Sequence, residues 1–150
     1  MLHIRDATEA DAAALNAVSK HLGYRALSEA EARATLAGVL AAPDHRVHLA
    51  EHDGQVVGWI HVFLARRVAS PPFHEIGGLV VDPAHRRCGV GAALVAHAHA
   101  EAGGTVRVRC RADRSATHRF YAALGFTESK TQCVFSLTAA ATEAGDNART

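Results

Sequence analysis

Residues 79–94 read LVVDPAHRRCGVGAAL. The apolar residues 79–81 predict the end of a strand buried on both faces, and Asp82-Pro83 stops that strand. Gly89 and Gly91 then lead directly into an Ala-rich helix. Because these positions carry no side chains, backbone N–H groups can surround an anion there, and the helix dipole adds to the attraction. The stretch predicts a phosphate-binding loop, with a tight turn and close helix packing as the alternative interpretation.

Turn and cap signals on either side of this loop predict the order of strands and helices. Ser28 and Glu31 have the spacing of a capping box, a turn at residues 52–54 predicts a hairpin, and Pro71-Pro72 predicts a break. The expected strands are residues 3–5, 46–51, 55–64, 75–81, 105–112 and 131–137, and the expected helices end at Gly23, before Pro43, at residue 102 and at Gly125. The order β-α-α-β-β-β-α-β-α-β indicates the α/β class, as a mixed (α+β) sheet with helices on both faces.

Length and composition limit the kind of protein. The 150 residues fit one domain, which we expect at residues 1–137, followed by a disordered tail at residues 138–150. Every apolar run is too short to cross a membrane, and acids near the N-terminus argue against a signal peptide. Three cysteines without a CxxC pair indicate reduced thiols and a cytoplasmic protein.

The basic residues are unevenly distributed. The net charge is only +1, which offers no case for a nucleic acid or membrane partner. Residues 86–119, however, contain seven arginines against Glu101 and Asp113, a balance of +5. This basic third begins at the predicted loop, where a polyanionic cofactor would need it.

Three motifs resemble those of one enzyme family. Arg86-x-x-Gly89-x-Gly91 resembles the R/Q-x-x-G-x-G/A acetyl-CoA loop of the GNAT superfamily of acyl-CoA-dependent N-acetyltransferases. Residues 118–126, HRFYAALGF, resemble its second signature, and the opening Ile4-Arg5-Asp6-Ala7-Thr8-x-x-Asp11 is similar to its first strand and helix start. The resemblance covers residues 2–137 in the family's order.

The resemblance implies that acetyl-CoA is a cosubstrate. It implies that the fourth and fifth strands splay apart, that the pantetheine arm pairs with the backbone of residues 79–81, and that residues 86–92 hold the pyrophosphate. The cofactor-binding residues it implies are Leu79, Val80, Val81, Arg86, Arg87, Cys88, Gly89, Val90, Gly91 and Ala92. One departure is that Arg114 or Ser115 stands where family members often have an Asn that touches the cofactor.

The resemblance also implies catalytic residues. Tyr121 lies where the family's usual acid for the leaving thiolate lies, and Glu75 is the candidate base, acting directly or through water. The alternatives are that Phe120-Tyr121 packs its helix against the sheet and that Glu75 is a carboxylate in solvent. His74 and His118 are further candidates for the base.

Tyr24 and Trp59 are the candidate acceptor-binding residues, with a plain loop and a core position as the respective alternatives. We expect no metal site. His97 and His99 point to different faces of one helix, and no Cys or acid cluster completes either that pair or His45-x-x-His48. Cys88 is either a modifiable thiol at a helix N-terminus or a small filler.

These features together predict an N-acetyltransferase that moves an acetyl group from acetyl-CoA to a primary amine of a small molecule by direct attack. The alternatives are acetylation of a protein N-terminus or lysine, and a non-catalytic acyl-CoA sensor. The strand expected at residues 131–137 leaves pairing across a homodimer open.

Overall fold

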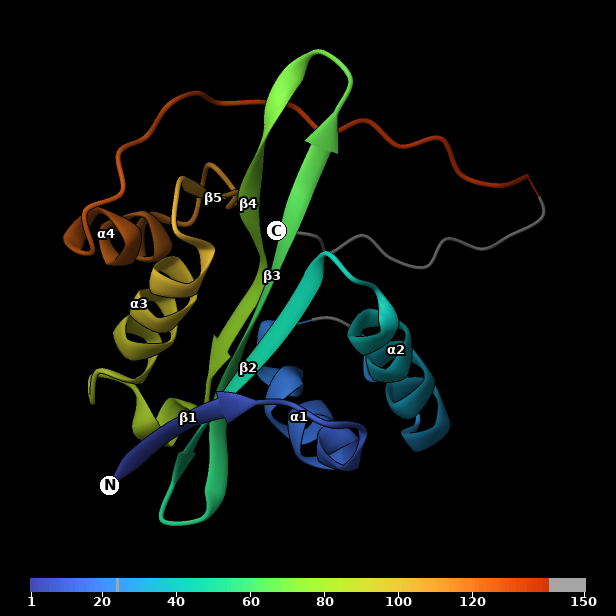
Figure 1. Cartoon of the computed structure of the whole chain (residues 1–150), viewed down its shortest axis with the longest axis vertical. Helices are drawn as coiled ribbons and strands as arrows, with labels where there is room; N and C mark the ends of the chain where they lie inside the picture. Colours follow the sequence, from blue (N-terminus) through green and yellow to red (C-terminus); the bar gives the residue numbers. More distant parts are fainter. Residues whose placement is uncertain (24, 141–150) are drawn as a thin grey trace. The chain divides into compact units, whose positions relative to one another are not determined.

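Five strands form one mixed sheet, in the order β1 (Leu2–Asp6), β2 (His45–His52), β3 (Gln55–Arg67), β4 (Ser70–Val81) and β5 (Val106–Val108). Neighbours from β1 to β4 are antiparallel, and β5 runs parallel to β4. Figure 1 shows the sheet in the computed structural model, which describes residues 1–23 and 25–140. The predicted α/β class with a mixed sheet is confirmed.

The chain divides into two units, Met1–Val108 and Arg109–Thr150, and each is described by itself. The first unit holds the whole sheet with α1 (Ala12–Ser19), α2 (Glu29–Ala41) and α3 (Val90–Ala102). The second holds α4 (Ser115–Ala123). No helix among the described residues is long and apolar enough to cross a membrane. The domain limits at residues 1–137 stay a prediction, and residues 141–150 of the expected tail lie outside the described residues.

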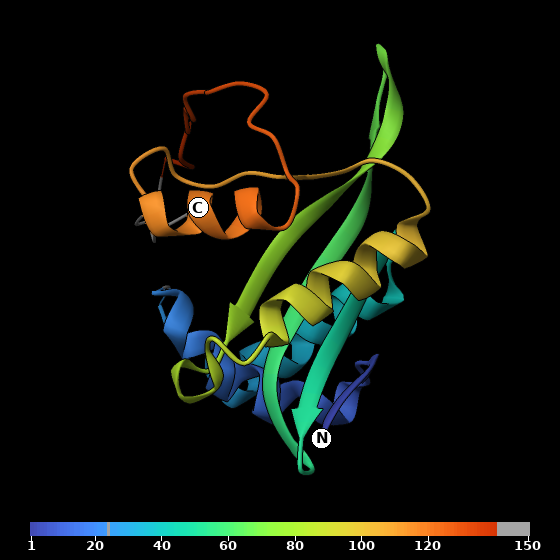
Figure 2. The same ribbon diagram turned by 90° about the vertical axis from the view of Figure 1, so that its left-hand side faces the viewer.

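Helices cover both faces of the sheet in the first unit, as predicted (Figures 1 and 2). On one face, Leu49 of β2 packs in a cluster with Leu15 of α1 and Leu36 of α2. On the other, a Cβ added to Gly58 of β3 would lie 3.4 Å from Leu94 of α3. Successive strand residues point to opposite faces. The pair Leu49 and Trp59 therefore faces α1 and α2, and the neighbouring pair Ala50 and Gly58 faces α3.

Local signals explain where the elements begin and end. The capping box at the start of α2 is formed, since Glu31 N–H donates to Ser28 Oγ at 3.1 Å and Ser28 N–H donates to Glu31 Oε1 at 2.8 Å. Asp53 and Gly54 both have positive φ, 50° and 80°, as a two-residue hairpin turn requires.

The fourth and fifth strands differ from their predicted limits. β4 begins at Ser70, so Pro71-Pro72 lies inside the strand and the predicted break is wrong. The pairing of β3 with β4 is irregular between Ala65 and Arg67, and such a stretch tolerates residues that lack an N–H. β5 covers only residues 106–108 of the expected 105–112.

The strand predicted at residues 131–137 is also wrong, because the structure describes these residues and assigns none of them to a strand. The apolar side chains of Val134, Phe135 and Leu137 are exposed, although the strand prediction required them to be buried against the sheet. A strand without a paired neighbour is not stable. The correction removes the strand on which the homodimer expectation rested.

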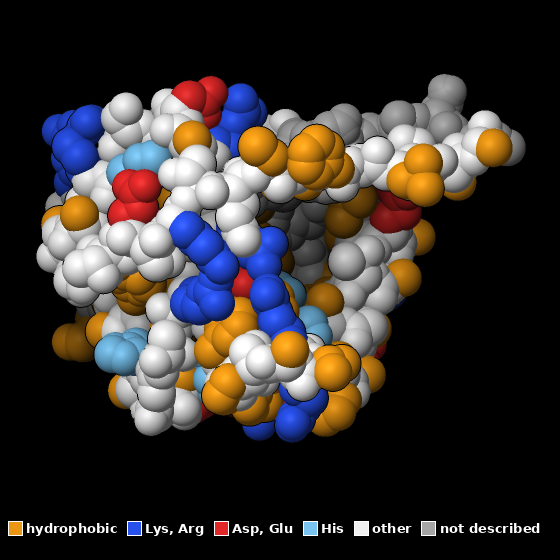
Figure 3. Space-filling model, turned by 90° about the horizontal axis from the view of Figure 1, so that it is seen from above, with side chains coloured by type: hydrophobic (Ala, Val, Ile, Leu, Met, Phe, Trp, Pro, Cys, Tyr) orange, Lys and Arg blue, Asp and Glu red, His pale blue; other side chains and the backbone are white. Residues whose placement is uncertain are grey.

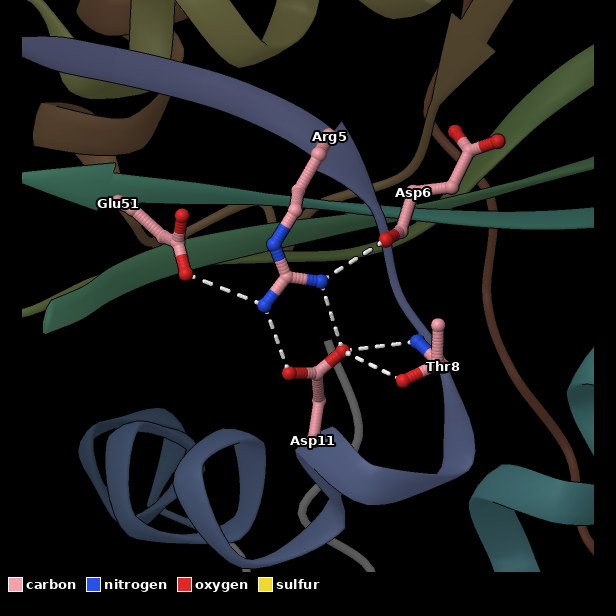
Figure 4. Close-up of polar contacts among 5 residues, drawn as sticks. All are labelled: Arg5, Asp6, Thr8, Asp11 and Glu51. Atoms are coloured by element: carbon pink, nitrogen blue, oxygen red, sulfur yellow. Dashed lines mark hydrogen bonds and ion pairs between the residues drawn. The ribbon is translucent and has the colours of Figure 1, made fainter. Parts of the chain in front are cut away.

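Arg5 of β1 and Asp11, which directly precedes α1, form a bidentate ion pair (Figure 4). The two Arg5 amino groups donate to the two Asp11 carboxylate oxygens at 2.9 and 2.8 Å, and one also donates to Glu51 at 3.1 Å. Thr8 N–H adds a 2.7 Å hydrogen bond to Asp11. Asp11 is buried, and its hydrogen bonds with Arg5 hold the pKa of its carboxyl below the usual range. The pair joins the first strand to the first helix.

Replacing Asp11 by Asn keeps the side-chain shape but removes the charge, and we expect a loss of about 2–3 kcal/mol in the free energy of unfolding near neutral pH, below the figure for a fully buried pair because Arg5 is partly exposed. Since the folded-state pKa of Asp11 is lowered, this stabilisation is complete above the unfolded-state pKa of about 4 and is lost as the pH falls through the folded-state value. Urea unfolding of both proteins at a series of pH values should show that the difference between their free energies of unfolding becomes smaller as the pH falls.

The matched control is Glu29→Gln, which breaks an exposed ion pair with Arg33 and should change stability little. A loss in the free energy of unfolding of Asp11→Asn that is the same at every pH would contradict a stabilising role for the ionised Asp11 carboxylate.

Candidate functional site

The loop between β4 and α3 is held by hydrogen bonds to the side chain and backbone of Asp82. Asp82 Oδ1 accepts a hydrogen bond from Ala84 N–H at 3.0 Å, and Asp82 O accepts one from His85 N–H at 2.9 Å. These bonds form the short turn Pro83–His85, which stops the strand as the sequence predicts. Arg87 and Gly89 then adopt positive φ values of 67° and 80°, so the chain curves sharply onto the helix.

The N-terminus of α3 is open to an anion. Gly89 is its N-cap, with no side-chain hydrogen bond to the first helical amides, and the Gly89 carbonyl accepts from Ala93 N–H at 2.9 Å. Arg86, Arg87 and Cys88 are exposed beside this end of the helix. Backbone donors, the positive helix end and two arginines suit a pyrophosphate group. The structure thus brings residues 86–92 together in one loop and helix start.

The outer edge of β4 is unpaired over its last residues. β5 pairs with β4 only at residues 74–76, whereas the pairing of β4 with β3 continues to Val81. Among the described residues no strand pairs with the outer edge at residues 77–81. Alternate N–H and C=O groups of such an edge point away from the paired neighbour. β5 ends at Val108, and the residues after it belong to the second unit, so the expected splaying of the fourth and fifth strands stays a prediction. The edge at residues 77–81 includes Leu79, Val80 and Val81.

Glu75 is a buried carboxylate between two strands. It lies opposite Phe63 of β3 and beside Arg107 of β5 in the sheet register. The Arg107 guanidinium stacks over the ring of Phe73 at 4.3 Å from its centroid, and Arg67 lies 5.2 Å from the same centroid. In the view onto this end of the β3–β4 hairpin, Lys and Arg side chains gather on the surface (Figure 3). The expected alternative of a carboxylate in solvent does not describe Glu75.

A pair of histidines that the sequence analysis did not assign to the site lies on the same face of the sheet. His45 Nδ1 is 2.9 Å from His61 Nε2. The His45 ring stacks with His61 and with Phe63, and the His61 ring makes a tilted contact with Phe63. Burial and the neighbouring His45 lower the pKa of His61 to about 4, so this imidazole is neutral at physiological pH. The only sequence signal was the spacing of His61 and Phe63, which puts both on one face of a strand.

Gly77 forms a bulge beneath this histidine pair. It is the extra residue in β4 between the pairs His61 with Gly78 and Val62 with Ile76. A Cβ at Gly77 would lie 2.7 Å from His61 Nδ1 and 3.3 Å from a ring carbon of Phe63. Only glycine therefore lets the His61 ring lie directly on β4.

Two other sequence candidates lie elsewhere. Trp59 packs against the core cluster under α1 and donates from its indole N–H to Ser19 Oγ at 3.0 Å, which favours its core role. His74 lines a cavity with His48 and Ala98 of α3, on the face opposite Glu75, so the two base candidates are not brought together. Tyr24 lies outside the described residues.

Tyr121 belongs to the second unit. Its ring makes edge contacts with Phe120 and Phe126, at centroid distances of 5.0 and 5.2 Å. Burial, with a smaller effect of Cys110, raises the pKa of the phenol, so it stays protonated at neutral pH and is chemically an acid rather than a base. His118 Nε2 is 2.8 Å from the backbone carbonyl of Arg111, a contact that uses one ring nitrogen as a donor.

Known proteins share this fold. Residues 11–126 match the family described as the acetyltransferase (GNAT) family. Among curated proteins, no sequence matches the chain significantly. The aminoglycoside 6′-N-acetyltransferase AAC(6′)-IG from Acinetobacter haemolyticus is similar in structure, with 24% identity, 91% of this chain and 99% of that chain covered, and a TM-score of 0.79.

Two structures of AAC(6′)-Iy are also similar. The complex with the bisubstrate analogue CoA-S-monomethyl-acetylneamine has 20% identity, a TM-score of 0.80 and coverage of 93% of this chain and 99% of that chain. The complex with CoA has 19% identity, a TM-score of 0.80 and coverage of 93% and 96%. At these identities the likeness shows the fold.

Replacing Gly77 by Ala should destabilise the protein by about 1–3 kcal/mol, because the added methyl group overlaps the His61 ring. The matched control is Gly38→Ala in α2, where an added Cβ meets nothing within 4 Å and should stabilise the helix by up to about 1 kcal/mol. Urea unfolding of both variants measures the difference. Equal stability of the two variants would show that the bulge has room for a side chain.

Proposed function

The chain belongs to the acetyltransferase (GNAT) family of acyl-CoA-dependent N-acetyltransferases, and from this premise we propose that it transfers an acetyl group from acetyl-CoA to a primary amine of a small molecule. The observation that carries the proposal is the succession of an unpaired strand edge and an open helix N-terminus along residues 77–92. A ligand with an extended arm joined to a pyrophosphate can pair its arm with the strand edge and place its pyrophosphate at the helix N-terminus.

The chemistry of CoA matches these two features. Its pantetheine arm contains amides, which can hydrogen-bond to the free edge of β4 at residues 79–81. Its pyrophosphate carries negative charge, which the amides of residues 87–92 and the exposed Arg86 and Arg87 would neutralise.

The transfer needs a base, an attack and an acid. In the proposed mechanism, the acceptor amine loses a proton through water to Glu75, and its nitrogen attacks the thioester carbonyl carbon. The tetrahedral intermediate collapses as the C–S bond breaks, and the Tyr121 hydroxyl gives its proton to the sulfur. Because burial raises the pKa of Tyr121, the phenol is protonated at neutral pH and has this proton to give.

The class of acceptor rests on similarity of fold. The solved structures that resemble this chain include aminoglycoside N-acetyltransferases, one of them bound to a bisubstrate analogue. Their acceptors are amines of small molecules, and this supports a small-molecule amine here. A protein N-terminus or lysine as acceptor, and acyl-CoA binding without turnover, are the other outcomes of the test.

The test is release of free CoA from acetyl-CoA in the presence of a panel of polyamines, amino acids, aminoglycosides and peptides. We expect saturable turnover with at least one small amine, and mass spectrometry should show a product heavier by one acetyl group. Turnover with peptides alone would move the proposal to protein acetylation. Tight binding of acetyl-CoA without turnover of any amine would indicate a sensor.

Tyr121→Phe removes only the phenolic oxygen and keeps the ring contacts with Phe120 and Phe126. Loss of the acid should lower kcat by about 100-fold or more, with little change in the KM for acetyl-CoA. The matched control is Ala122→Ser, an exposed substitution at the next position of α4, which should retain full activity. Undiminished kcat/KM of Tyr121→Phe across the pH range would remove Tyr121 from the mechanism.

A further inference from the structure

Four side chains outside the proposed acetyl-transfer site converge on the α3 face of the sheet. Asp6 of β1 and His48 of β2 are directly opposite each other in the antiparallel register. His97 and Glu101 are one turn apart on α3, an i, i+4 spacing that places both on one helix face. Each of the four residues offers one ligand atom, and these atoms all lie within 4.8 Å of one another.

We propose that Asp6, His48, His97 and Glu101 bind one divalent transition-metal cation of the Zn²⁺ class. Two imidazole nitrogens and two carboxylate oxygens are donors that Zn²⁺ and its first-row neighbours accept. In a tetrahedral site with bonds of about 2.1 Å, ligand atoms are about 3.4 Å apart, so the separations between ligand atoms must shorten by up to about 1.4 Å. The side chains of Asp6 and Glu101, 74% and 46% exposed, are free enough of packing to make that movement.

The surroundings of His48 favour a positive charge between the carboxylates of Asp6 and Glu101. His48 is 1% exposed, its Nδ1 is 2.9 Å from Asp6 Oδ1, and its Nε2 is 3.2 Å from Glu101 Oε1. A neutral imidazole has one N–H and can donate to only one of the two oxygens. A metal ion bound to one nitrogen of His48 would balance the negative charge of the two carboxylates that converge on this buried ring.

The remaining neighbours permit a cation. Arg46 forms an ion pair with Glu101, but its Nε is 3.9 Å from Glu101 Oε1, beyond hydrogen-bonding distance, and its side chain is largely exposed. Asp6, His48 and Glu101 also line a cavity of about 450 Å³ together with Arg46 and His74. This cavity provides an entry path and space for a water ligand on the metal. Once bound, the ion would tie the C-terminal half of α3 to the β1–β2 pair.

The test is direct metal binding by the full chain, without a histidine tag, after removal of metals by a chelator. Titration with Zn²⁺ in a calorimeter should show one equivalent bound with a Kd in the micromolar range or below, and Co²⁺ should give the visible absorption of an ordered site. His97→Ala and Glu101→Gln should each weaken binding at least 10-fold. Both side chains reach solvent at the edge of the helix–sheet contact, so the variants are expected to fold, unlike variants of the buried His48.

The matched control is His99→Ala, which removes an exposed histidine two residues away on the same helix and should bind like the wild type. A rise in Tm with Zn²⁺ in the wild type and in His99→Ala, but not in His97→Ala, would support the site independently of acetyl transfer. Alkylation of the three cysteines beforehand should leave binding unchanged. Absence of one-equivalent binding, loss of it on alkylation, or equal affinity of His97→Ala and His99→Ala would each overturn the proposal.

Discussion

Hydrogen bonds between β4 and β5 stop after three residue pairs, while those between β4 and β3 continue to the end of β4. The free edge that results leads without interruption into Asp82-Pro83, the turn at Arg87 and Gly89, and the N-terminus of α3. Because the edge and the helix start are consecutive in the chain, their spacing is set by the backbone alone. A cosubstrate that uses both meets a surface that is already formed.

The two faces of the sheet carry different chemistry. Glu75, His61 and Phe63 lie on the face covered by α1 and α2, where the bulge at Gly77 lets an uncharged imidazole rest on β4. His48 lies on the opposite face, with the two side chains from α3. His45 and His48 are three residues apart in β2, and the alternation of strand side chains separates them. One histidine-rich strand therefore contributes to two distinct clusters.

Features that depend on neighbouring residues could be predicted from the sequence. The capping box of Ser28 and Glu31, the turn at Asp53-Gly54 and the glycine loop after β4 all follow from local backbone chemistry, and the structure has each of them. The errors concern strands whose existence depends on a partner. Pro71-Pro72 continues β4 because the irregular pairing with β3 tolerates it, and residues 131–137 form no strand although their composition suits one.

The sequence by itself determined the order of elements as far as the last helix, the glycine loop after β4 and the motifs that identify the family, because each depends on residues a few positions apart. Only the tertiary structure decided that His97 meets His48 rather than His99, that Trp59 belongs to the core, and that His61 is neutral beside His45. Those outcomes depend on strand register and on which helix face meets the sheet. Strand register and the orientation of each helix on the sheet are set by packing between segments tens of residues apart, and no local pattern encodes that packing.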